Sequence, residues 1–371
     1  MKMTINRAKF LEALGNVRKV LPSKSAVPVL GCVEINAVSE GVIELVGTDM
    51  ATNIKVTCPC VEGEGRFLVN CEKIASVASV MVGENITISS VEGENRILVT
   101  DGKSKYHMTI VVNEVLPAVF GNTMKFCTAT VENLRDAFGE VLFAVDKKQS
   151  NAPGTYPGVF FDIVDDSTVN LVATDRRKLA VCRLEVEDVY NEDDEKVRRS
   201  FFLPVRSANI AKNFCKEGKC EISRFNHMVT FKFDGIEFNT TLIGRPFPNY
   251  TLILDAAAGA DNRLDIHGAD LCGIIRRATV LNNGVGQKVV KIDLAQNRMV
   301  VSSTDKEYGN YEEEMLCGYT GADLAVMVDP DAFCEMLNAF VNPDVVVMLR
   351  NESAPLHVAS GNTVVIFMPC H

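Results

Sequence analysis

The sequence predicts an α+β protein made of three repeats of one unit, with two helices and several antiparallel strands in each. The dipeptide Thr-Asp ends three apolar, strand-like segments spaced by about one third of the chain, at Thr48-Asp49, Thr174-Asp175 and Thr304-Asp305. An amphipathic helical pattern precedes each dipeptide and a second one follows it. Because strand-like segments outnumber helical ones, the units belong to the α+β class rather than the doubly wound α/β class.

The helices are predicted from apolar residues at i, i+3, i+4 and i+7 spacing, which place one apolar face on a helix. The first helix of each repeat contains Phe10, Leu11, Leu14, Val17 and Leu21; Leu134, Ala137, Phe138, Val141, Leu142 and Val145; and Leu271, Ile274, Ile275, Ala278 and Leu281. The second helix contains Ile74, Val77, Ala78 and Met81; Ile210, Ala211 and Phe214; and Phe333, Met336, Leu337 and Phe340. Pro204 and Pro330 suit the entry to the last two helices, where a missing N–H costs little.

Each repeat closes with a predicted hairpin, because a turn-forming pair with glycine stands between two segments rich in β-forming residues. The three turns are Asp101-Gly102, Asp234-Gly235 and Ser360-Gly361. Residues 121–123 (GNT) and 255–261 (DAAAGAD) are typical of linkers. The acidic segment 191–195 (NEDDE) is interpreted as a solvated loop. We therefore expect three domains, which span residues 1–122, 125–254 and 259–371.

The composition is typical of soluble globular domains, with 371 residues of which 47% are hydrophobic and 23% charged. No apolar run reaches the roughly 18–20 residues that span a bilayer, and the first residues lack the pattern of a signal peptide. We therefore expect a cytoplasmic protein without a membrane segment. The twelve cysteines lie mostly singly in apolar segments, which predicts buried free thiols rather than disulfides or a metal site.

The sequence contains no P-loop, no dinucleotide-binding glycine motif, no HExxH and no GxSxG. The aspartates of the Thr-Asp pairs allow two interpretations: a carboxylate cluster, as in a metal-dependent nuclease, or three side chains that each cap the backbone of their own turn. We favour capping, because the repeat separates the three positions. Repeated domains without a reactive cluster predict a scaffold or a binding ring that is not an enzyme and needs no cofactor.

Basic residues form several clusters, including clusters on four of the six predicted helices, although the formal net charge is −10. The clusters are Arg7, Lys9, Arg18, Lys19 and Lys24; Lys147 and Lys148; Arg176, Arg177 and Lys178; Arg206, Lys212 and Lys216; and Arg276 and Arg277. Segregated positive charge suits contacts to the phosphates of a duplex. The alternatives are ordinary solvated helix faces and an adaptor of repeated domains that never meets DNA.

Four segments carry the most distinctive residue combinations: 21–35 (LPSKSAVPVLGCVEI), 172–186 (VATDRRKLAVCRLEV), 244–254 (GRPFPNYTLIL) and 364–371 (VVIFMPCH). In this order they resemble the bacterial DNA polymerase III β subunit family, the sliding clamps. The third segment departs from the family's strand-to-linker motif, because Pro246 is inserted and Asn249 replaces the usual aspartate.

The resemblance implies a head-to-tail homodimer of three-domain chains that closes into a ring, with helices lining the hole and sheets outside. Such a ring encircles double-stranded DNA without sequence preference and confers processivity without catalysis. It tethers the replicative polymerase α subunit, the clamp-loader δ subunit, and other polymerases and repair proteins through short peptide motifs.

The family's peptide pocket, between its second and third domains, maps onto a mainly apolar set of residues. In this chain they are Tyr156, Thr174, Arg177, Leu179, Pro248, Ile253, Pro355, Ile366, Met368 and Pro369. The family's DNA contacts map onto Lys24, Lys73, Lys147, Lys148, Gln149 and Arg206. The chain departs from the family at Arg176 (often glycine), Arg177 (often histidine), Glu72 (often arginine) and its Cys370-His371 end.

Overall fold

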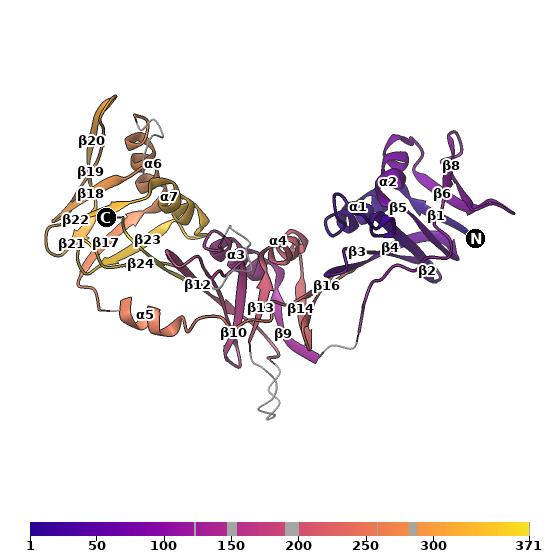
Figure 1. The fold of residues 1–371 in the computed structure, drawn as a ribbon, viewed down its shortest axis with the longest axis horizontal. Coiled ribbons are helices and arrows are strands. Elements are labelled where there is room, and N and C mark those ends of the chain that lie inside the picture. Colours follow the sequence, from indigo (N-terminus) through magenta and orange to yellow (C-terminus); the bar gives the residue numbers. More distant parts are fainter. Residues whose placement is uncertain (122–123, 147–153, 190–199, 258, 282–287, 371) are drawn as a thin grey trace. The chain divides into compact units, whose positions relative to one another are not determined.

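The computed structural model describes residues 1–121, 124–146, 154–189, 200–257, 259–281 and 288–370 (Figure 1). These residues form two compact units. The described residues of the first unit lie within 1–131, 188–189 and 213–242, and those of the second within 132–187, 200–212 and 243–370. The acidic segment 191–195 predicted as a loop lies outside the described residues.

The predicted three repeats are present, because the order strand, helix, four strands, helix, three strands recurs along the chain, with one additional strand in the middle of the third repeat. The first repeat contains β1 (Lys2–Asn6), α1 (Arg7–Arg18), a 3₁₀ turn η1 (Pro28–Gly31), β2 (Cys32–Ser39), β3 (Val42–Thr48), β4 (Thr52–Glu64), β5 (Arg66–Asn70), α2 (Cys71–Val80), β6 (Asn85–Ser90), β7 (Arg96–Thr100) and β8 (Lys105–Thr109).

The second and third repeats follow the same order. The second contains β9 (Met124–Thr130), α3 (Val131–Leu142), β10 (Gly158–Asp165), β11 (Thr168–Thr174), β12 (Lys178–Glu185), β13 (Ser200–Pro204), α4 (Val205–Phe214), β14 (Lys219–Phe225), β15 (Met228–Phe233) and β16 (Ile236–Thr241). The third contains β17 (Asn262–His267), α6 (Gly268–Ala278), β18 (Val290–Ala295), β19 (Arg298–Asp305), β20 (Gly309–Leu316), β21 (Gly318–Thr320), β22 (Leu324–Val328), α7 (Pro330–Ala339), β23 (Asp344–Leu349), β24 (Leu356–Ser360) and β25 (Thr363–Phe367).

Strands of neighbouring repeats join in common antiparallel sheets. In the first unit a 12-stranded sheet pairs β4 of the first repeat with β16 of the second, with Asn53 opposite Asn239. In the second unit a 9-stranded sheet pairs β12 of the second repeat with β25 of the third, with Leu179 opposite Ile366. The remaining strands form a 4-stranded sheet in the order β20-β19-β18-β22. Two repeats therefore share a sheet at each of these junctions.

The apolar faces predicted for the helices are buried. Phe10, Leu14 and Val17 of α1 have 0% exposed surface, and α1 packs against α2 as α6 packs against α7 (Figure 1). Five residues at the ends of the predicted patterns lie just beyond the observed helices, which end at Arg18, Val80, Leu142, Ala278 and Ala339; they are Leu21, Met81, Val145, Leu281 and Phe340. The apolar pattern continues there because the turn after a helix also covers core, as the 2% exposure of Val145 illustrates.

A short helix, α5 (Thr251–Ala257), includes the first residues of the segment 255–261, which was expected to be a linker. The linker interpretation of residues 255–261 is therefore incomplete, because its first residues are helical. Ala256 and Ala257 are strong helix formers, and Leu254 and Ala257 pack on a buried cluster, which supplies the tertiary contact that a short helix needs. The cluster contains Val172, Leu179, Val181, Tyr250 and Ile366.

The capping interpretation of the Thr-Asp pairs is confirmed in the first repeat. The Thr48 hydroxyl donates to the carbonyl of Thr52 (3.0 Å) and accepts the N–H of Met50 (2.9 Å). Asp49 Oδ1 accepts the N–H groups of Ala51 (3.1 Å) and Thr52 (2.7 Å). Met50 adopts a φ of 77°, which the turn requires at this position. The pair therefore closes the β3–β4 turn.

The third pair differs in detail but has the same role, because Asp305 Oδ1 accepts the N–H groups of Glu307 (2.9 Å) and Tyr308 (3.0 Å). Across the described ranges, no three His, Cys, Asp or Glu side chains gather where they could hold a metal ion. The aspartates are thus turn-capping residues.

All twelve cysteines are free thiols, and nine of them are buried. Burial raises the pKa of Cys71, Cys127 and Cys182 to about 12, because an apolar environment disfavours the thiolate. These side chains therefore act as small apolar core residues at neutral pH.

Asp101 fastens the β7–β8 hairpin to the segment after α2. Its Oδ1 accepts the N–H groups of Lys103 (3.0 Å) and Ser104 (2.7 Å), and its Oδ2 accepts those of Val82 (2.9 Å) and Gly83 (3.1 Å). These backbone donors favour the ionised carboxylate and hold the pKa of Asp101 well below its ordinary value.

We predict that Asp101→Asn lowers the free energy of unfolding at pH 7 and that the difference from the wild type shrinks below about pH 4. The sign follows from linkage: a carboxyl with a lowered folded-state pKa stabilises above its unfolded pKa of about 3.9, and this contribution is lost as the pH falls. Urea titrations between pH 3 and 7 measure it. Asp234→Asn, in the second hairpin, is the control; a pH-independent loss in Asp101→Asn would contradict the prediction.

Candidate functional site

The second unit contains a cavity of about 230 Å³ at the end of the β12–β25 pair. Its lining is mainly apolar with a basic rim, and consists of Tyr156, Thr174, Arg176, Arg177, Lys178, Leu179, Pro248, Ile253, Pro355, Ile366 and Met368. Nine of the ten residues that the resemblance assigned to a peptide pocket are in this set. The tenth, Pro369, is buried and does not line the cavity.

The floor of the cavity is part of the hydrophobic core. Leu179 and Ile366 face each other across the β12–β25 pair and are each 3% exposed. Met368, just after β25, is 41% exposed, and its N–H donates to the carbonyl of Arg177 (2.9 Å). Met368 is therefore held by its backbone while its side chain stays accessible, so filling the core is not its role.

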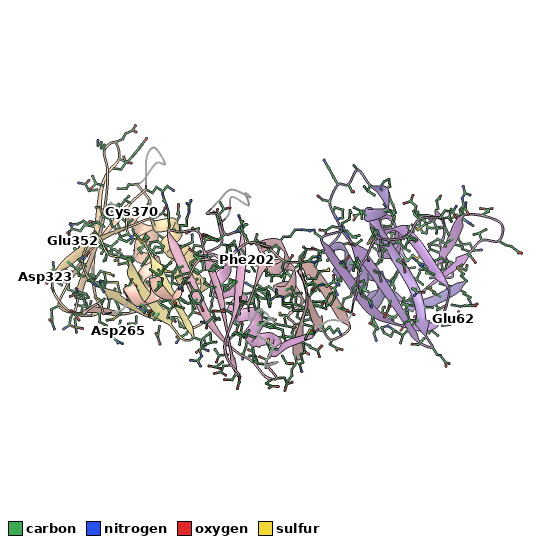
Figure 2. All side chains as sticks on the ribbon, turned by 60° about the horizontal axis from the view of Figure 1, so that its bottom comes forward. Glu62, Phe202, Asp265, Asp323, Glu352 and Cys370 are labelled. Carbon is green, nitrogen blue, oxygen red and sulfur yellow. The ribbon has the colours of Figure 1, made fainter. Side chains whose placement is uncertain are left out.

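One wall of the cavity is formed by Pro248 and Ile253 of the segment 244–253, which is fixed at two places. Phe247 stacks on Phe160 with ring centroids 4.7 Å apart and meets Phe202 edge-on at 5.3 Å (Figure 2 labels Phe202). The aromatic contacts of Phe247 hold the chain directly after Pro246. The inserted proline itself is exposed.

Tyr250 is the second anchor of this wall. Its hydroxyl donates to Asp162 Oδ2 (2.8 Å) and accepts from the side-chain amide of Asn170 (3.1 Å). Burial raises the pKa of Tyr250 to about 12, so the phenol keeps the proton that it donates. The wall residues Pro248 and Ile253, on either side of Tyr250, are thereby held beside the floor.

The rim of the cavity is the second Thr-Asp turn. The Thr174 hydroxyl donates to the carbonyl of Lys178 (2.8 Å) and accepts the N–H of Arg176 (3.0 Å). Asp175 Oδ1 accepts the N–H groups of Arg177 and Lys178, both at 2.9 Å. Arg176 has a φ of 75°. This is the pattern of the first repeat, with Arg176 and Arg177 at the positions of Met50 and Ala51.

A buried carboxylate fixes the far end of the β12–β25 pair. Glu140 of α3 is 6% exposed; its Oε1 accepts the N–H of Val341 (2.9 Å), and its Oε2 accepts the hydroxyl of Thr363 (2.5 Å) and the thiol of Cys182 (3.4 Å). These three donors belong to both repeats that share the sheet. Glu140 was not predicted, because a glutamate beside the apolar face of a helix looks like an ordinary surface residue in the sequence.

The residues assigned to DNA contacts lie on exposed segments, as far as they are described. Lys24 is exposed in the loop after α1, and Lys73 is exposed in the first turn of α2. Arg206 is exposed in the first turn of α4, in the second unit. The remaining three, Lys147, Lys148 and Gln149, lie outside the described residues.

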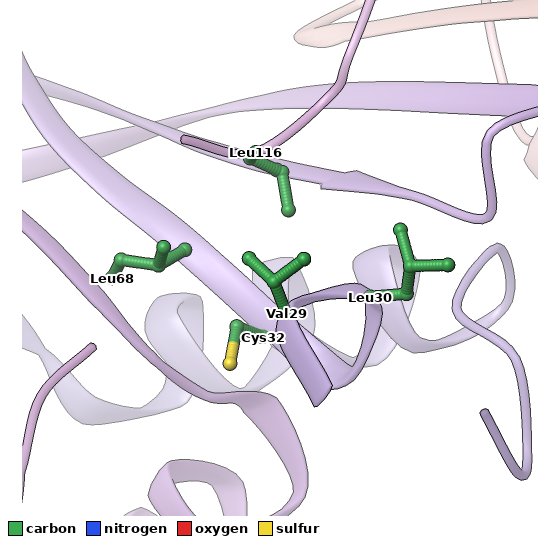
Figure 3. Close-up of a cluster of buried hydrophobic side chains, with 5 residues drawn as sticks. All are labelled: Val29, Leu30, Cys32, Leu68 and Leu116. Carbon is green, nitrogen blue, oxygen red and sulfur yellow. The ribbon is translucent and has the colours of Figure 1, made fainter. Parts of the chain in front are cut away.

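The loop that carries Lys24 is anchored where it enters the 3₁₀ turn. Val29 and Leu30 of η1 pack with Cys32, Leu68 and Leu116 in a buried cluster (Figure 3). Each of the five is at most 6% exposed. The cluster therefore fixes one end of a loop whose own residues, 23–28, are exposed.

Glu72 reduces the positive charge of the surface beside Lys73. It pairs with Arg18 of α1, with Arg18 Nη2 and Glu72 Oε2 2.8 Å apart. Both side chains are about half exposed or more, so the pair contributes little stability. Its main effect is to neutralise Arg18, which leaves Lys73 as the basic residue that this turn presents to solvent.

In the part of the chain that the structure describes, no helix is long and apolar enough to cross a membrane.

The sequence matches all three domains of one family in order. The matches are to the DNA polymerase III beta subunit, with its N-terminal domain at residues 1–119, its central domain at 128–249 and its C-terminal domain at 258–366. The beta sliding clamp of Lactococcus lactis is 25% identical over 98% of this chain and 96% of that protein. The beta sliding clamp of Staphylococcus epidermidis is 24% identical over 94% and 92%.

Solved structures share the fold along the whole chain. The DNA polymerase III subunit beta from Pseudomonas aeruginosa superposes with a TM-score of 0.89 at 20% identity, covering 100% of both chains. The DNA polymerase sliding clamp from Bacillus subtilis gives 0.87 at 18% identity, covering 100% of this chain and 99% of that one.

Proposed function

The chain belongs to the DNA polymerase III beta subunit family, and we propose that two copies of it close head to tail into a ring around duplex DNA. It is a DNA sliding clamp, a non-catalytic processivity factor whose partners are DNA and the polymerase. The match of three family domains in order, over nearly the whole chain, is the observation that carries this conclusion. The proposed place of action is the cytoplasm.

We propose that ring closure uses two open sheet edges. β8 ends the sheet of the first unit and β20 ends the 4-stranded sheet of the second, and neither has a partner on its outer side among the described strands. Open edges are templates for pairing with another chain. Lys105 on β8 and Glu312 on β20 are exposed and have no ion-pair partner in the described part of the chain, so both charges are available to another chain. Because one is basic and the other acidic, the two edges have complementary charges. A heterologous contact that closes generates a ring.

The proposed DNA surface consists of Lys24, Lys73 and Arg206 together with Lys147, Lys148 and Gln149. Exposed lysines and arginines at helix starts and loops contact phosphates without reading bases. A closed ring stays on DNA by topology, so a few such contacts suffice in a protein with a net charge of −10. Binding independent of sequence follows from this arrangement.

The proposed partner site is the cavity of about 230 Å³ on the second unit. Short peptides of the polymerase α subunit, the clamp-loader δ subunit and other polymerases and repair proteins place apolar anchors against Leu179, Ile366 and Met368. The accessible Met368 and the half-buried prolines Pro248 and Pro355 suit a hydrophobic anchor, and the rim supplies polar contacts. Pro369 belongs to this proposed site only as a buried support of Met368.

The ring proposal predicts a dimer of twice 40.6 kDa at micromolar concentration that remains on circular DNA and slides off linear DNA. Glu312→Lys should weaken the dimer through repulsion from Lys105, and the double variant Glu312→Lys, Lys105→Glu should restore it. Sedimentation velocity measures both. A monomeric wild type at micromolar concentration would refute the ring, whereas a missing rescue would refute only this edge pairing.

The DNA proposal predicts that Lys24→Glu or Lys73→Glu reduces loading onto circular DNA. The loss should be largest at low salt and shrink as salt rises, because phosphate contacts are screened. Lys232→Glu, which makes the same charge change at an exposed position of β15, is the matched control. Retention assays on two templates of unrelated sequence complete the test; a dependence on template sequence would contradict it.

The pocket proposal predicts that Met368→Ala weakens binding of a polymerase α-subunit peptide by about 1–2 kcal/mol, as loss of a central anchor contact does. The dimer and the melting temperature should remain unchanged, because the side chain is 41% exposed. Met327→Ala is the matched control, since Met327 is 42% exposed and does not line the cavity. Fluorescence anisotropy measures the affinity, and full-affinity binding by Met368→Ala would show that the peptide binds elsewhere.

A further inference from the structure

We infer that the cavity selects partner peptides that carry an aspartate or glutamate side chain beside their apolar anchors, because Arg176 and Arg177 place two positive charges on its rim that no described residue neutralises. The inference rests on the proposed function of the cavity as a peptide pocket. It goes further by naming the chemical property that distinguishes a good partner peptide of this chain from a poor one.

The charges of the rim are unbalanced. Arg176, Arg177 and Lys178 line the cavity, and no Asp or Glu does so among the described residues. Lys178 is already neutralised, since its Nζ lies 3.0 Å from Asp175 Oδ2 and its side chain is 9% exposed. Arg176 and Arg177 are exposed, and within the described ranges neither side chain has an ion pair or a hydrogen bond. Two guanidinium groups therefore remain available to a ligand.

The turn does not need these two arginines in order to fold. The first repeat forms the same turn, with the same four hydrogen bonds, around Met50 and Ala51. Arg176 even occupies the left-handed backbone region, at a φ of 75°, where Met50 sits at 77°. Because uncharged residues support this geometry elsewhere in the chain, the guanidinium groups have no structural role that would explain them.

The backbone that carries the two charges is held beside the apolar lining. The hydrogen bond from the N–H of Met368 to the carbonyl of Arg177 joins the rim to the proposed anchor contact. Chains joined in this way lie about 4.8 Å apart. A peptide that buries an apolar side chain against Met368 therefore brings its neighbouring residues within reach of a guanidinium group.

The chemistry of guanidinium points to a carboxylate. Its planar fork of N–H donors matches the two oxygens of a carboxylate, and such charge-assisted bonds are stronger than those between neutral groups. An acidic side chain within the peptide fits this rim better than a terminal carboxylate, because the peptide then continues past the anchors on both sides.

The experiment uses the full-length protein and a displayed library of random decapeptides. Peptides are selected separately on the wild type, on Arg176→Met with Arg177→Ala, and on Lys306→Met, which removes an exposed charge away from the cavity. The double variant copies the residues of the first turn, so it is expected to fold. The best wild-type binder is then synthesised with both ends capped, with its acidic residue either intact or changed to the corresponding amide.

We expect Asp and Glu to be enriched on the wild type and on Lys306→Met but not on the double variant. The acidic capped peptide should bind the wild type roughly three- to tenfold more tightly than its amide form. This ratio should approach one in the double variant and fall with added salt. Arg177→Glu should reverse the preference, toward a peptide with lysine at the same position.

Two failures are distinguishable. If acidic and amide peptides bind the wild type equally while Met368→Ala weakens both, the pocket stands and the inference about charge is wrong. The inference also fails if enrichment is confined to peptides with free C-termini, because the terminal carboxylate is then the ligand. If Met368→Ala leaves all selected peptides bound at full affinity, the proposed pocket itself fails.

Discussion

The pairing of β12 with β25 is the interaction on which the second unit depends. It joins strands of two repeats into one sheet, so the backbone hydrogen bonds that would otherwise stay open at a sheet edge are satisfied between repeats. The same five-residue ladder places Leu179 beside Ile366 and ends where the cavity opens. Stability of the junction and shape of the cavity therefore have a common origin.

The ladder is fastened at both ends by different chemistry. At one end the Glu140 carboxylate accepts three hydrogen bonds from both repeats in a buried position. Such a group is costly to bury unless its partners are complete, which makes it sensitive to small displacements of the strands. At the other end the Thr-Asp turn and the backbone bond of Met368 close the pair. A turn that is only architectural in the first repeat thus becomes the rim of a cavity in the second.

Periodic features could be predicted from the sequence, since a buried helix face requires apolar residues at regular spacing. The residues Phe10, Leu14 and Val17 are an example. The three repeats were predicted from such apolar patterns on both sides of the Thr-Asp pairs. The capping role of the aspartates was also predictable, because Asx turns are a local property. The capping role also contradicts the enzyme alternative, because a metal-dependent nuclease would need these carboxylates to converge. The family is non-catalytic.

Features that arise from contacts between distant segments were harder to predict from the sequence. Neither the helix α5 nor the role of Glu140 has a local pattern, because both depend on β25 lying beside elements far away in the chain. The cavity residues came from family resemblance rather than from spacing. The burial of Lys178 was missed for the same reason: its partner Asp175 is close in sequence, but the strand that covers it is not.

The distance between β12 and β25 along the chain has a consequence for biosynthesis. Strand β12 spans Lys178–Glu185, whereas β25 spans Thr363–Phe367 and is made only after the other strands of the third repeat. The edge of β12 therefore stays open throughout translation of the third repeat, and long-range pairing of this kind is slow and exposed to wrong partners. The floor of the cavity is complete only when β25 has been made. A truncated or still-growing chain consequently has no finished site with which to capture a partner.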